Sequence, residues 1–391
     1  MSYYFLSFLG IIATLASLYT ISLGRDYEKR TLTTFSRSKA GFSPRTCLVM
    51  ACKGNEPELA KNITAMIHQD YEDYYSMIVT DDANDPAYEI AKSIINKYPA
   101  SNATLITADI HMHASGKVSA LLTALKKTRN KTEVYAFLDS DAFAPSNWLT
   151  ELVDPLHNPA IGATTGFRWY FPLHNGFWAH VQAAWNASGT SLLFNDKFNF
   201  PWGGAMAVRA DTLEKIGIDK VWAKAISDDL SLNSALRKNG YKILFLPQCM
   251  VASFSTITLT DFFRWATNQT ALVRAYNPLL WDYALAAYTF FNLAFVLGTV
   301  CALTSMFLGP NWLIPAFLLV TPAPIGVLRS KARSALFKRA MPSMHTEFDR
   351  SSHKDCIASL IVPWIMSYCI LKSSRIDEIE WRGRKYKLAT S

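Results

Sequence analysis

The sequence predicts an α/β domain flanked by membrane-spanning helices, and three observations support this prediction. Short apolar strands alternate with helices between residues 45 and 280, a pattern typical of parallel strands joined by right-handed crossovers. Uncharged stretches long enough to cross a membrane lie on both sides of this region. Hydrophobic residues make up 50% of the 391 residues and charged residues 18%, so some apolar side chains are expected to contact lipid.

The net charge of +8 does not indicate a nucleic-acid partner. Lys and Arg are scattered through the middle of the chain and concentrate beside the apolar stretches near both ends, which favours contact with a membrane surface. The six cysteines include no C-x-x-C pair, and two or three of them lie in strongly apolar runs. We therefore expect buried thiols rather than disulfides or zinc ligands.

The first expected element is a transmembrane helix over residues 1–24. Residues 5–24 are uncharged, and about 20 such residues cross a hydrocarbon core of roughly 30 Å. Basic residues follow this stretch, whereas a signal peptide would carry them before its apolar core. The positive-inside rule then predicts an external N-terminus, a cytoplasmic linker over residues 25–44 and a cytoplasmic domain over residues 45–280.

Strand and helix alternate at the start of this domain, with strands expected at 46–51 and 75–80 and helices at 58–68 and 88–97. Asp82 and Asp85 follow the second strand, at the sheet edge where α/β proteins bind ligands. A carboxylate there can accept a hydrogen bond from a ribose hydroxyl or a uracil N–H. An Asp-rich turn before the next helix explains the same residues equally well.

A helix expected at 118–126 begins just after Gly116 and Lys117. Gly116 permits close backbone approach, and a lysine near a helix N-terminus suits a phosphate or an acidic ribose contact. A solvated lysine is the alternative interpretation.

The strongest local signal is Asp139-Ser140-Asp141, directly after an apolar strand expected at 134–138. Two acids two residues apart can share a divalent cation, and Mg²⁺ or Mn²⁺ prefers one or two carboxylates together with phosphate oxygens. The pattern therefore favours a metal-bound nucleoside diphosphate. A polar turn after the strand is the alternative.

Aromatic residues are dense between residues 167 and 202, and two glycines, Gly203 and Gly204, follow Trp202. These glycines indicate backbone brought close to a ligand, while aromatic faces suit sugars and lipid boundaries equally well. Asp228 and Asp229 then open a helix expected at 230–238, which precedes a strand at 242–246. The acid pair is either a helix cap or the source of a general base, Asp229.

A C-terminal membrane region is expected over residues 281–371. Residues 283–308 and 312–328 form two spans, and the loop between them is short enough to make them a hairpin. Basic residues after the second span return the chain to the cytoplasm.

The segment 356–371 is short for a regular span and contains Pro363. We expect it to re-enter the membrane or to form a short span. A basic cytoplasmic tail follows over residues 372–391.

Taken in order, these motifs resemble a known family. The series Asp82, Asp139-x-Asp141, Asp229 and Arg264-Trp265 resembles the D, D, D, (Q/R)xxRW order of processive-type inverting glycosyltransferases with a GT-A fold. The segments KGNEPELAKNITAMIHQDY, DDANDPA, PWGGAMAVR and IEWRGRKYKL are similar to signatures of the ceramide glucosyltransferase family, bacterial members included. Two departures are visible: Asp261 stands where Gln or Arg begins the last motif, and Asp228 stands where Glu is more common.

The resemblance implies a GT-A-type, Rossmann-like mixed sheet and a role for each motif. Asp82 and Asp85 would hold the nucleoside, while Asp139 and Asp141 would hold ribose, diphosphate and Mg²⁺ or Mn²⁺. Asp229 would be the catalytic base. The remaining donor- or acceptor-binding positions would be Lys117, Trp202, Gly203, Gly204, Asp228, Arg264 and Trp265.

The resemblance also implies transfer of a hexose, glucose from UDP-glucose, to a lipid hydroxyl such as that of ceramide, with a β-linked product. A processive polysaccharide synthase of the cellulose or hyaluronan kind shares the motifs, although two or three C-terminal spans are few for an export channel. A non-catalytic membrane scaffold, whose acids are only caps and turns, is the third possibility. An interfacial basic-aromatic anchor is the alternative for Arg264 and Trp265.

Overall fold

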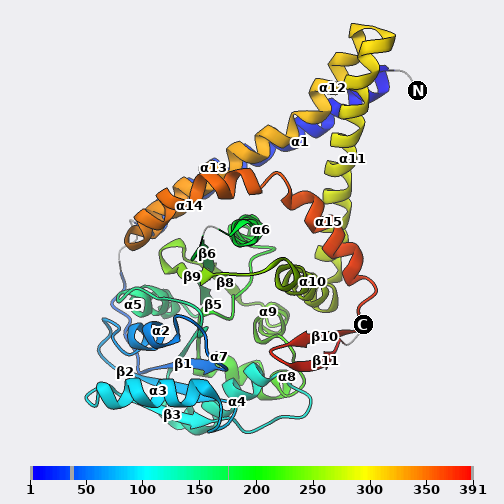
Figure 1. The fold of residues 1–391 in the computed structure, drawn as a ribbon. Helices are drawn as coiled ribbons and strands as arrows, with labels where there is room; N and C mark the ends of the chain where they lie inside the picture. Colours follow the sequence, from blue (N-terminus) through cyan, green and yellow to red (C-terminus); the bar gives the residue numbers. More distant parts are fainter. Residues whose placement is uncertain (1–2, 36–38, 175, 389–391) are drawn as a thin grey trace.

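The computed structural model describes residues 3–35, 39–174 and 176–388. An α/β domain lies at the bottom of the view in Figure 1, and long helices α1 (Tyr3–Phe35), α11 (Pro278–Leu308) and α12 (Leu313–Val320) extend from it at the top. Helices α13 (Pro322–Ala340), α14 (His345–Ala358) and α15 (Val362–Ser373) form an arch between the two parts (Figure 1).

The domain is built on a seven-stranded mixed sheet with strand order β3-β2-β1-β4-β7-β5-β8. Strand β7 pairs antiparallel with both of its neighbours, while the remaining pairs are parallel. This confirms the predicted α/β class with a mixed sheet. The strands are β1 (Thr46–Cys52), β2 (Tyr74–Thr80), β3 (Ala103–Thr107), β4 (Val134–Leu138), β5 (Ile161–Thr165), β7 (Ala205–Arg209) and β8 (Lys242–Phe245).

Both faces of the sheet are buried, which explains why its strands are nearly continuous apolar runs. In β1, Leu48 and Met50 belong to the core on one face and Val49 to the core on the other. Phe137 of β4 joins Val49 on the second face, where it packs against the edge of Trp222. The helices of the domain are α2 (Leu59–Met66), α3 (Pro86–Lys97), α4 (Gly116–Thr128), α5 (Trp148–Val153), α6 (Phe177–Leu193), α7 (Ala210–Lys215), α8 (Ile218–Trp222), α9 (Asp228–Lys238) and α10 (Leu259–Tyr276).

A second, two-stranded parallel sheet joins this domain to the arch. It consists of β6 (Arg168–Pro172) and β9 (Val251–Ser255). Trp169 of β6 packs against Phe337 of α13 and Phe348 of α14, with ring centroids 5.3 and 5.1 Å apart. The aromatic density of the sequence thus serves partly to attach the domain to the arch.

Among the described residues, three helical segments are long and apolar enough to cross a membrane: Tyr3–Thr34, Pro278–Leu308 and Pro310–Ala340. The first extends beyond the expected span, so residues 25–35 of the expected linker are helical. These residues contain neither Gly nor Pro, and Tyr27 stacks on Phe194 at 4.5 Å, which ties this extension to the domain. Residues 36–38 of the expected linker lie outside the described residues.

The second C-terminal span also differs from the prediction, because helix continues to Ala340 rather than ending at residue 328. The basic side chains that follow residue 328 therefore lie on α13. Helices α14 and α15 are bent by 66° at a short break and together have the length and composition of a broken span or a re-entrant loop.

The expected basic tail is folded, not free. Strands β10 (Glu378–Trp381) and β11 (Arg384–Lys387) form an antiparallel hairpin, with Gly383 at a positive φ of 76° in its turn. Ile379 is 1% exposed and packs in a small core with Ala271 and Leu272 of α10. Alternating side chains at 378–381 bury one face of the strand, which is why this charged segment folds. Residues 389–391 lie outside the described residues.

Candidate active site

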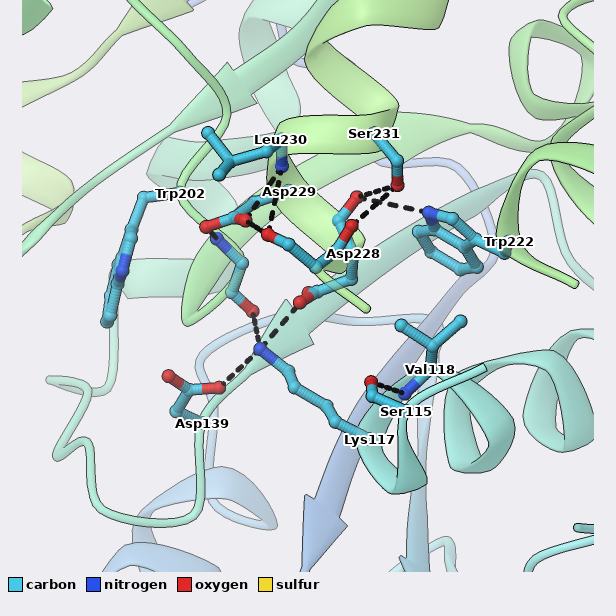
Figure 2. A network of polar contacts seen from close by, with 12 residues as sticks. Ser115, Lys117, Val118, Asp139, Trp202, Trp222, Asp228, Asp229, Leu230 and Ser231 are labelled. Atoms are coloured by element: carbon cyan, nitrogen blue, oxygen red, sulfur yellow. Dashed lines mark hydrogen bonds and ion pairs between the residues drawn. The ribbon is translucent and has the colours of Figure 1, made fainter. Parts of the chain in front are cut away.

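Four segment ends meet at the carboxyl edge of the sheet (Figure 2). Asp139 follows β4, and its N–H donates to the Gly204 carbonyl. Lys117 lies in the first turn of α4, where Ser115 Oγ caps the helix by accepting from Val118 N–H at 3.2 Å. Asp228 lies in the first turn of α9. The sheet topology therefore brings together residues that are 22 to 111 positions apart in sequence.

Lys117 is the centre of this cluster (Figure 2). Its Nζ lies 2.8 Å from Asp139 Oδ1 and 3.0 Å from Asp228 Oδ2, and it donates to the Gly203 carbonyl at 3.2 Å. Burial lowers the pKa of Lys117, but the two carboxylates outweigh burial and raise it above its usual value. Lys117 is thus a fixed cation at the edge of the sheet rather than a solvated lysine.

The two acids that hold Lys117 differ in protonation. Burial raises the pKa of Asp139, but Lys117 and Arg168 together lower it to about 2. Burial also raises the pKa of Asp228, and with Asp229 and Asp139 adding negative charge it stays at about 6 in spite of Lys117. Asp228 therefore exchanges its proton close to neutral pH, whereas Asp139 remains ionised.

Arg168 is a second cation in the cluster, and the sequence interpretation missed it. Its guanidinium lies 2.6 Å from Asp139 Oδ2 and 2.7 Å from Asp141 Oδ2, donates to Tyr170 Oη at 2.7 Å and lies over the Trp202 ring at 4.6 Å. It is the one charged residue in an aromatic strand. A single charge among aromatic residues is the sequence feature from which Arg168 could have been identified as a site residue.

Asp139 and Asp141 have the donor chemistry that a divalent cation requires. Both are carboxylates that line the same cavity, and oxygen ligands suit Mg²⁺ or Mn²⁺. Arg168 donates to both oxygens of Asp141 and to Oδ2 of Asp139, and Lys117 contacts Asp139 Oδ1. Each carboxylate oxygen has a second lone pair with which it could bind a cation. Among the described residues no group of three His, Cys, Asp or Glu could hold a metal, so phosphate oxygens would have to supply the remaining ligands.

Asp229 lines the cavity beside Asp228 but faces a different set of donors (Figure 2). Its Oδ1 accepts from Leu230 N–H at 2.7 Å and from Ser227 Oγ, and its Oδ2 accepts from Gly203 N–H at 3.4 Å. Ser227 is the N-cap of α9, accepting from Leu230 N–H. Asp229 is therefore oriented by its own helix end, and the cap role belongs to Ser227.

Gly203 and Gly204 are positions where no larger residue fits. A Cβ on Gly203 would overlap Asp228 Oδ2, and a Cβ on Gly204 would overlap the Trp202 ring and Asp139 Oδ2. The two glycines thus let the backbone after Trp202 pass between the acids. The close approach to a ligand that the sequence pattern indicated stays a prediction.

The structure does not bring Asp82 and Asp85 to the cavity wall. Asp82 is exposed and accepts from Asn84 N–H, and Asp85 caps α3 and accepts from Gly54 N–H at 2.7 Å. Asp81 lines the cavity instead. It lies 2.8 Å from Lys53 Nζ and 3.0 Å from Arg384. Asp81 is the first residue after β2, so the position of the strand end is the sequence feature that could have identified it as a cavity residue.

Arg264 and Trp265 of α10 also line the cavity. Trp265 packs edge-on against Trp185 and Tyr170, with centroids 4.8 and 5.9 Å away. Arg264 is exposed and pairs with Asp261 at 2.5 Å. Asp261 thus holds the arginine on its own helix.

The C-terminal hairpin closes one side of the cavity, which the sequence interpretation did not foresee. Arg384 pairs with Asp81, and Tyr386 Oη accepts from Gly116 N–H at 3.2 Å. Arg382 donates to the Lys53 carbonyl at 2.6 Å and pairs with Glu56. The tail therefore contacts the first turns after β1 and β2 and the start of α4.

One continuous cavity of about 1220 Å³ is lined by Asp81, Lys117, Arg168, Trp202, Arg264, Trp265, Arg384 and the acids named next. Its polar end contains Asp139, Asp141, Asp228 and Asp229. Its other end is lined mainly by apolar residues of α1, α11 and α13, which belong to the candidate membrane spans, together with Arg329 and Arg333 of α13. A single cavity therefore joins the sheet edge to the membrane helices.

Comparisons with known proteins give distant relatives. A ceramide glucosyltransferase from Komagataella phaffii is 28% identical over 107 residues, 27% of this chain and 21% of that protein. A beta-monoglucosyldiacylglycerol synthase from Synechocystis is 22% identical over 280 residues, 66% of this chain and 55% of that protein. The chain thus matches less than two thirds of the length of either relative.

A solved structure is also similar to this chain. The mannosyltransferase PcManGT from Pyrobaculum calidifontis, in complex with GDP-Man and Mn²⁺, has a TM-score of 0.46 and 16% identity, covering 93% of this chain and 99% of that chain. The family comparison is more extensive, because residues 5–391 match Glycosyl transferase family 21. This match confirms the family predicted from the motifs: the chain belongs to glycosyl transferase family 21.

Proposed function

We propose that this chain is an inverting glycosyltransferase that moves glucose from UDP-glucose to a lipid hydroxyl, such as that of ceramide, and forms a β-glycoside. The observation that carries the proposal is the continuous cavity, which has ionised groups at one end and apolar membrane helices at the other. A water-soluble sugar nucleotide and a lipid need such a cavity in order to meet. Relatives described as acting on ceramide and on diacylglycerol make both hydroxyls candidate acceptors.

The donor end offers both charges that a metal-bound diphosphate requires. Lys117 and Arg168 are fixed cations, and Asp139 and Asp141 would hold Mg²⁺ or Mn²⁺. When bound, the metal would neutralise charge on the departing UDP. Asp81 lines the cavity and pairs with Lys53 and Arg384. We therefore assign to Asp81 the contact with the nucleoside, which the motif first suggested for Asp82 and Asp85.

Asp229 is our candidate for the general base. The acceptor oxygen would attack the anomeric carbon while its proton passes to Asp229, and the bond from that carbon to the UDP oxygen would break with its electron pair on UDP. Attack on the face opposite UDP converts an α-linked donor into a β-linked product. Asp228 would keep Lys117 in place and so position the donor, since Lys117 bridges Asp228 and Asp139.

The acceptor side is formed by aromatic and apolar groups. Trp202 and Trp265 would contact the sugar and the lipid headgroup, and Gly203 and Gly204 would permit close approach. Arg264, though paired with Asp261, is near enough to the cavity to add positive charge. Basic residues on α13 favour a cytoplasmic location for the domain by the positive-inside rule.

A transfer assay tests this function. Purified full-length protein would be incubated with radiolabelled UDP-glucose and either ceramide or diacylglycerol, with and without Mg²⁺ or Mn²⁺. We expect one glucose per lipid and no product without the metal. A growing polysaccharide would indicate a processive synthase, and no product with any lipid or metal would indicate a scaffold; either result contradicts the proposal.

A further inference from the structure

Two arginines in the membrane end of the cavity, Arg329 and Arg333, have no counter-ion in the part of the chain that the structure describes. Both lie on α13 and line the cavity, and the Nε of each is buried without a hydrogen-bond partner. Within residues 3–35, 39–174 and 176–388, neither guanidinium forms an ion pair. The neighbouring basic residues Lys338 and Arg339 are paired, with Asp349 and Glu28.

The arrangement is electrostatically unfavourable as it stands. Arg329 and Arg333 are four residues apart on one helix face, a spacing at which like charges repel. The ionisable groups that act most on Arg333 are Arg329, Tyr288 and Cys356, none of them acidic. A partly buried charge without a partner is costly, so an anion bound between the two arginines would remove that cost.

Phosphate is the anion that best fits two guanidinium groups. The planar fork of an arginine binds phosphate oxygens in a bidentate manner and is weakly hydrated, which favours partly buried sites. The donor's own diphosphate already has Lys117 and Arg168 at the opposite end of the cavity. A second phosphate site is therefore in excess of what the sugar nucleotide needs.

The surroundings of the arginines favour a lipid as the source of this phosphate. Apolar cavity residues lie near them, including Ile325 and Ala323 of α13 and Ala287 of α11. The arginines lie in the C-terminal half of the span Pro310–Ala340, and a long arginine side chain there can extend toward headgroup level. Basic pockets between membrane helices on the cytoplasmic side bind anionic headgroups.

We propose that Arg329 and Arg333 bind the phosphate of an anionic phospholipid in the membrane end of the cavity. The phospholipid site adds to the proposed function. It rests on that function in one respect, namely that the cavity receives lipid. The phospholipid would occupy the cavity beside the acceptor and neutralise the two guanidinium groups. Because binding needs neither donor nor acceptor, it is measured separately from sugar transfer.

Native mass spectrometry of the full-length protein in detergent tests the site. The protein is supplied with equal amounts of phosphatidylglycerol and phosphatidylcholine, and retained lipid is counted. We expect wild type to retain phosphatidylglycerol about tenfold over phosphatidylcholine, because the choline ammonium compensates the phosphate charge in phosphatidylcholine, whereas phosphatidylglycerol has a net negative charge that the two arginines attract. Equal retention of the two lipids by wild type overturns the proposal without any variant.

Variants locate the site. Arg329→Gln combined with Arg333→Gln is expected to lose the preference, while Arg329→Lys with Arg333→Lys retains part of it. Lys331→Gln is the matched control, because Lys331 is an exposed residue of the same helix that does not line the cavity. Loss of the preference in Lys331→Gln to the same extent, or full preference in the double Gln variant, contradicts the assignment.

Two competitors distinguish a lipid headgroup from other phosphates. An excess of inorganic phosphate or of UDP should leave phosphatidylglycerol bound, because neither has acyl chains to bury against the apolar walls. Displacement by inorganic phosphate would mean a free-phosphate site, and displacement by UDP would mean that the arginines belong to the donor site. Each of these displacements overturns the lipid assignment.

Discussion

Asp228 and Asp229 are adjacent in sequence, yet their side chains have different surroundings. Asp228 is 5% exposed and bound to Lys117, whereas Asp229 is half-buried and held by the N-terminus of α9 and Gly203 N–H. A carboxylate that accepts backbone hydrogen bonds and faces the cavity is positioned to take a proton from a substrate. A buried carboxylate that forms an ion pair with a lysine is positioned to hold that lysine in place.

The first prediction separates these roles by substitution. Asp229→Asn keeps the side chain's size and its contact with Leu230 N–H but cannot accept a proton, so transfer should fall by at least about 10²-fold. UDP-glucose affinity should change by less than about twofold. Transfer rate and donor affinity are measured on the same preparation. Asp228→Asn is the neighbouring control, with a smaller loss of rate and weaker donor binding, because Lys117 loses one of its two partners. Equal, small effects at both positions would refute the assignment of the base.

The second prediction concerns pH. The pKa of Asp228 is raised from its ordinary value of 3.8 to about 6. Its contribution to folding stability is therefore fully present below pH 3.8 and lost as the pH rises through about 6. Its ionised form, which holds Lys117, is present above that pH. Transfer should thus fall about tenfold per pH unit below the pKa.

A rate profile from acid to neutral pH checks this, with thermal unfolding measured at each point to exclude denaturation. The Asp228→Asn variant should be slower at high pH and should lack this ionisation. If the transfer rate of the variant falls at acid pH as it does in wild type, a group other than Asp228 causes the fall.

Elements with one clear periodicity could be predicted from the sequence, and elements that depend on distant partners could not. Strand β4 was predicted with its exact bounds, because an apolar run between polar residues needs no information beyond itself. The hairpin of β10 and β11 was missed because charged side chains dominate it, and only packing of Ile379 against α10 makes it fold. The helical extension of α1 beyond residue 24 likewise depends on a contact with α6, between Tyr27 and Phe194.

Site prediction shows the same division. Asp139, Asp141 and Asp229 were found because each follows an element boundary that the sequence reveals. Arg168 was missed because its partners are 27 and 29 residues away, and no local pattern connects them. Asp81 was passed over for Asp82, since choosing between two adjacent acids requires the exact end of β2.

The third prediction tests the hairpin as part of the donor site. Arg384→Ala removes the ion pair with Asp81, so the hairpin should be released and UDP-glucose affinity should fall by about tenfold. Hydrogen exchange at residues 378–387 and donor titration measure the two effects. Lys385→Ala is the matched control, because Lys385 lies on the same strand and is exposed. Similar results for the two variants would contradict a donor-site role for the hairpin.

The whole molecule is expected to have its α/β domain and tail on one side of the membrane and the loop before α12 on the other. The fourth prediction uses introduced cysteines, for which the background is low because all six native cysteines are buried. Asn311→Cys should be labelled by an impermeant thiol reagent on intact cells, whereas Lys126→Cys should be labelled only after lysis. Both positions are exposed, so burial does not explain a difference. The reverse pattern would invert the proposed orientation.

The central claim is that donor and lipid meet in one cavity that extends between the membrane helices. Ala287 and Ala286 are adjacent on α11, and Ala287 lines the cavity whereas Ala286 does not. The most direct measurement compares Ala287→Trp with Ala286→Trp for lipid glucosylation rate and UDP-glucose affinity. We expect Ala287→Trp to lower the rate by about tenfold or more while donor affinity is kept, because an indole fills the lipid end only, and Ala286→Trp to behave like wild type. Equal rates for the two variants, or loss of donor binding in Ala287→Trp, would contradict the account.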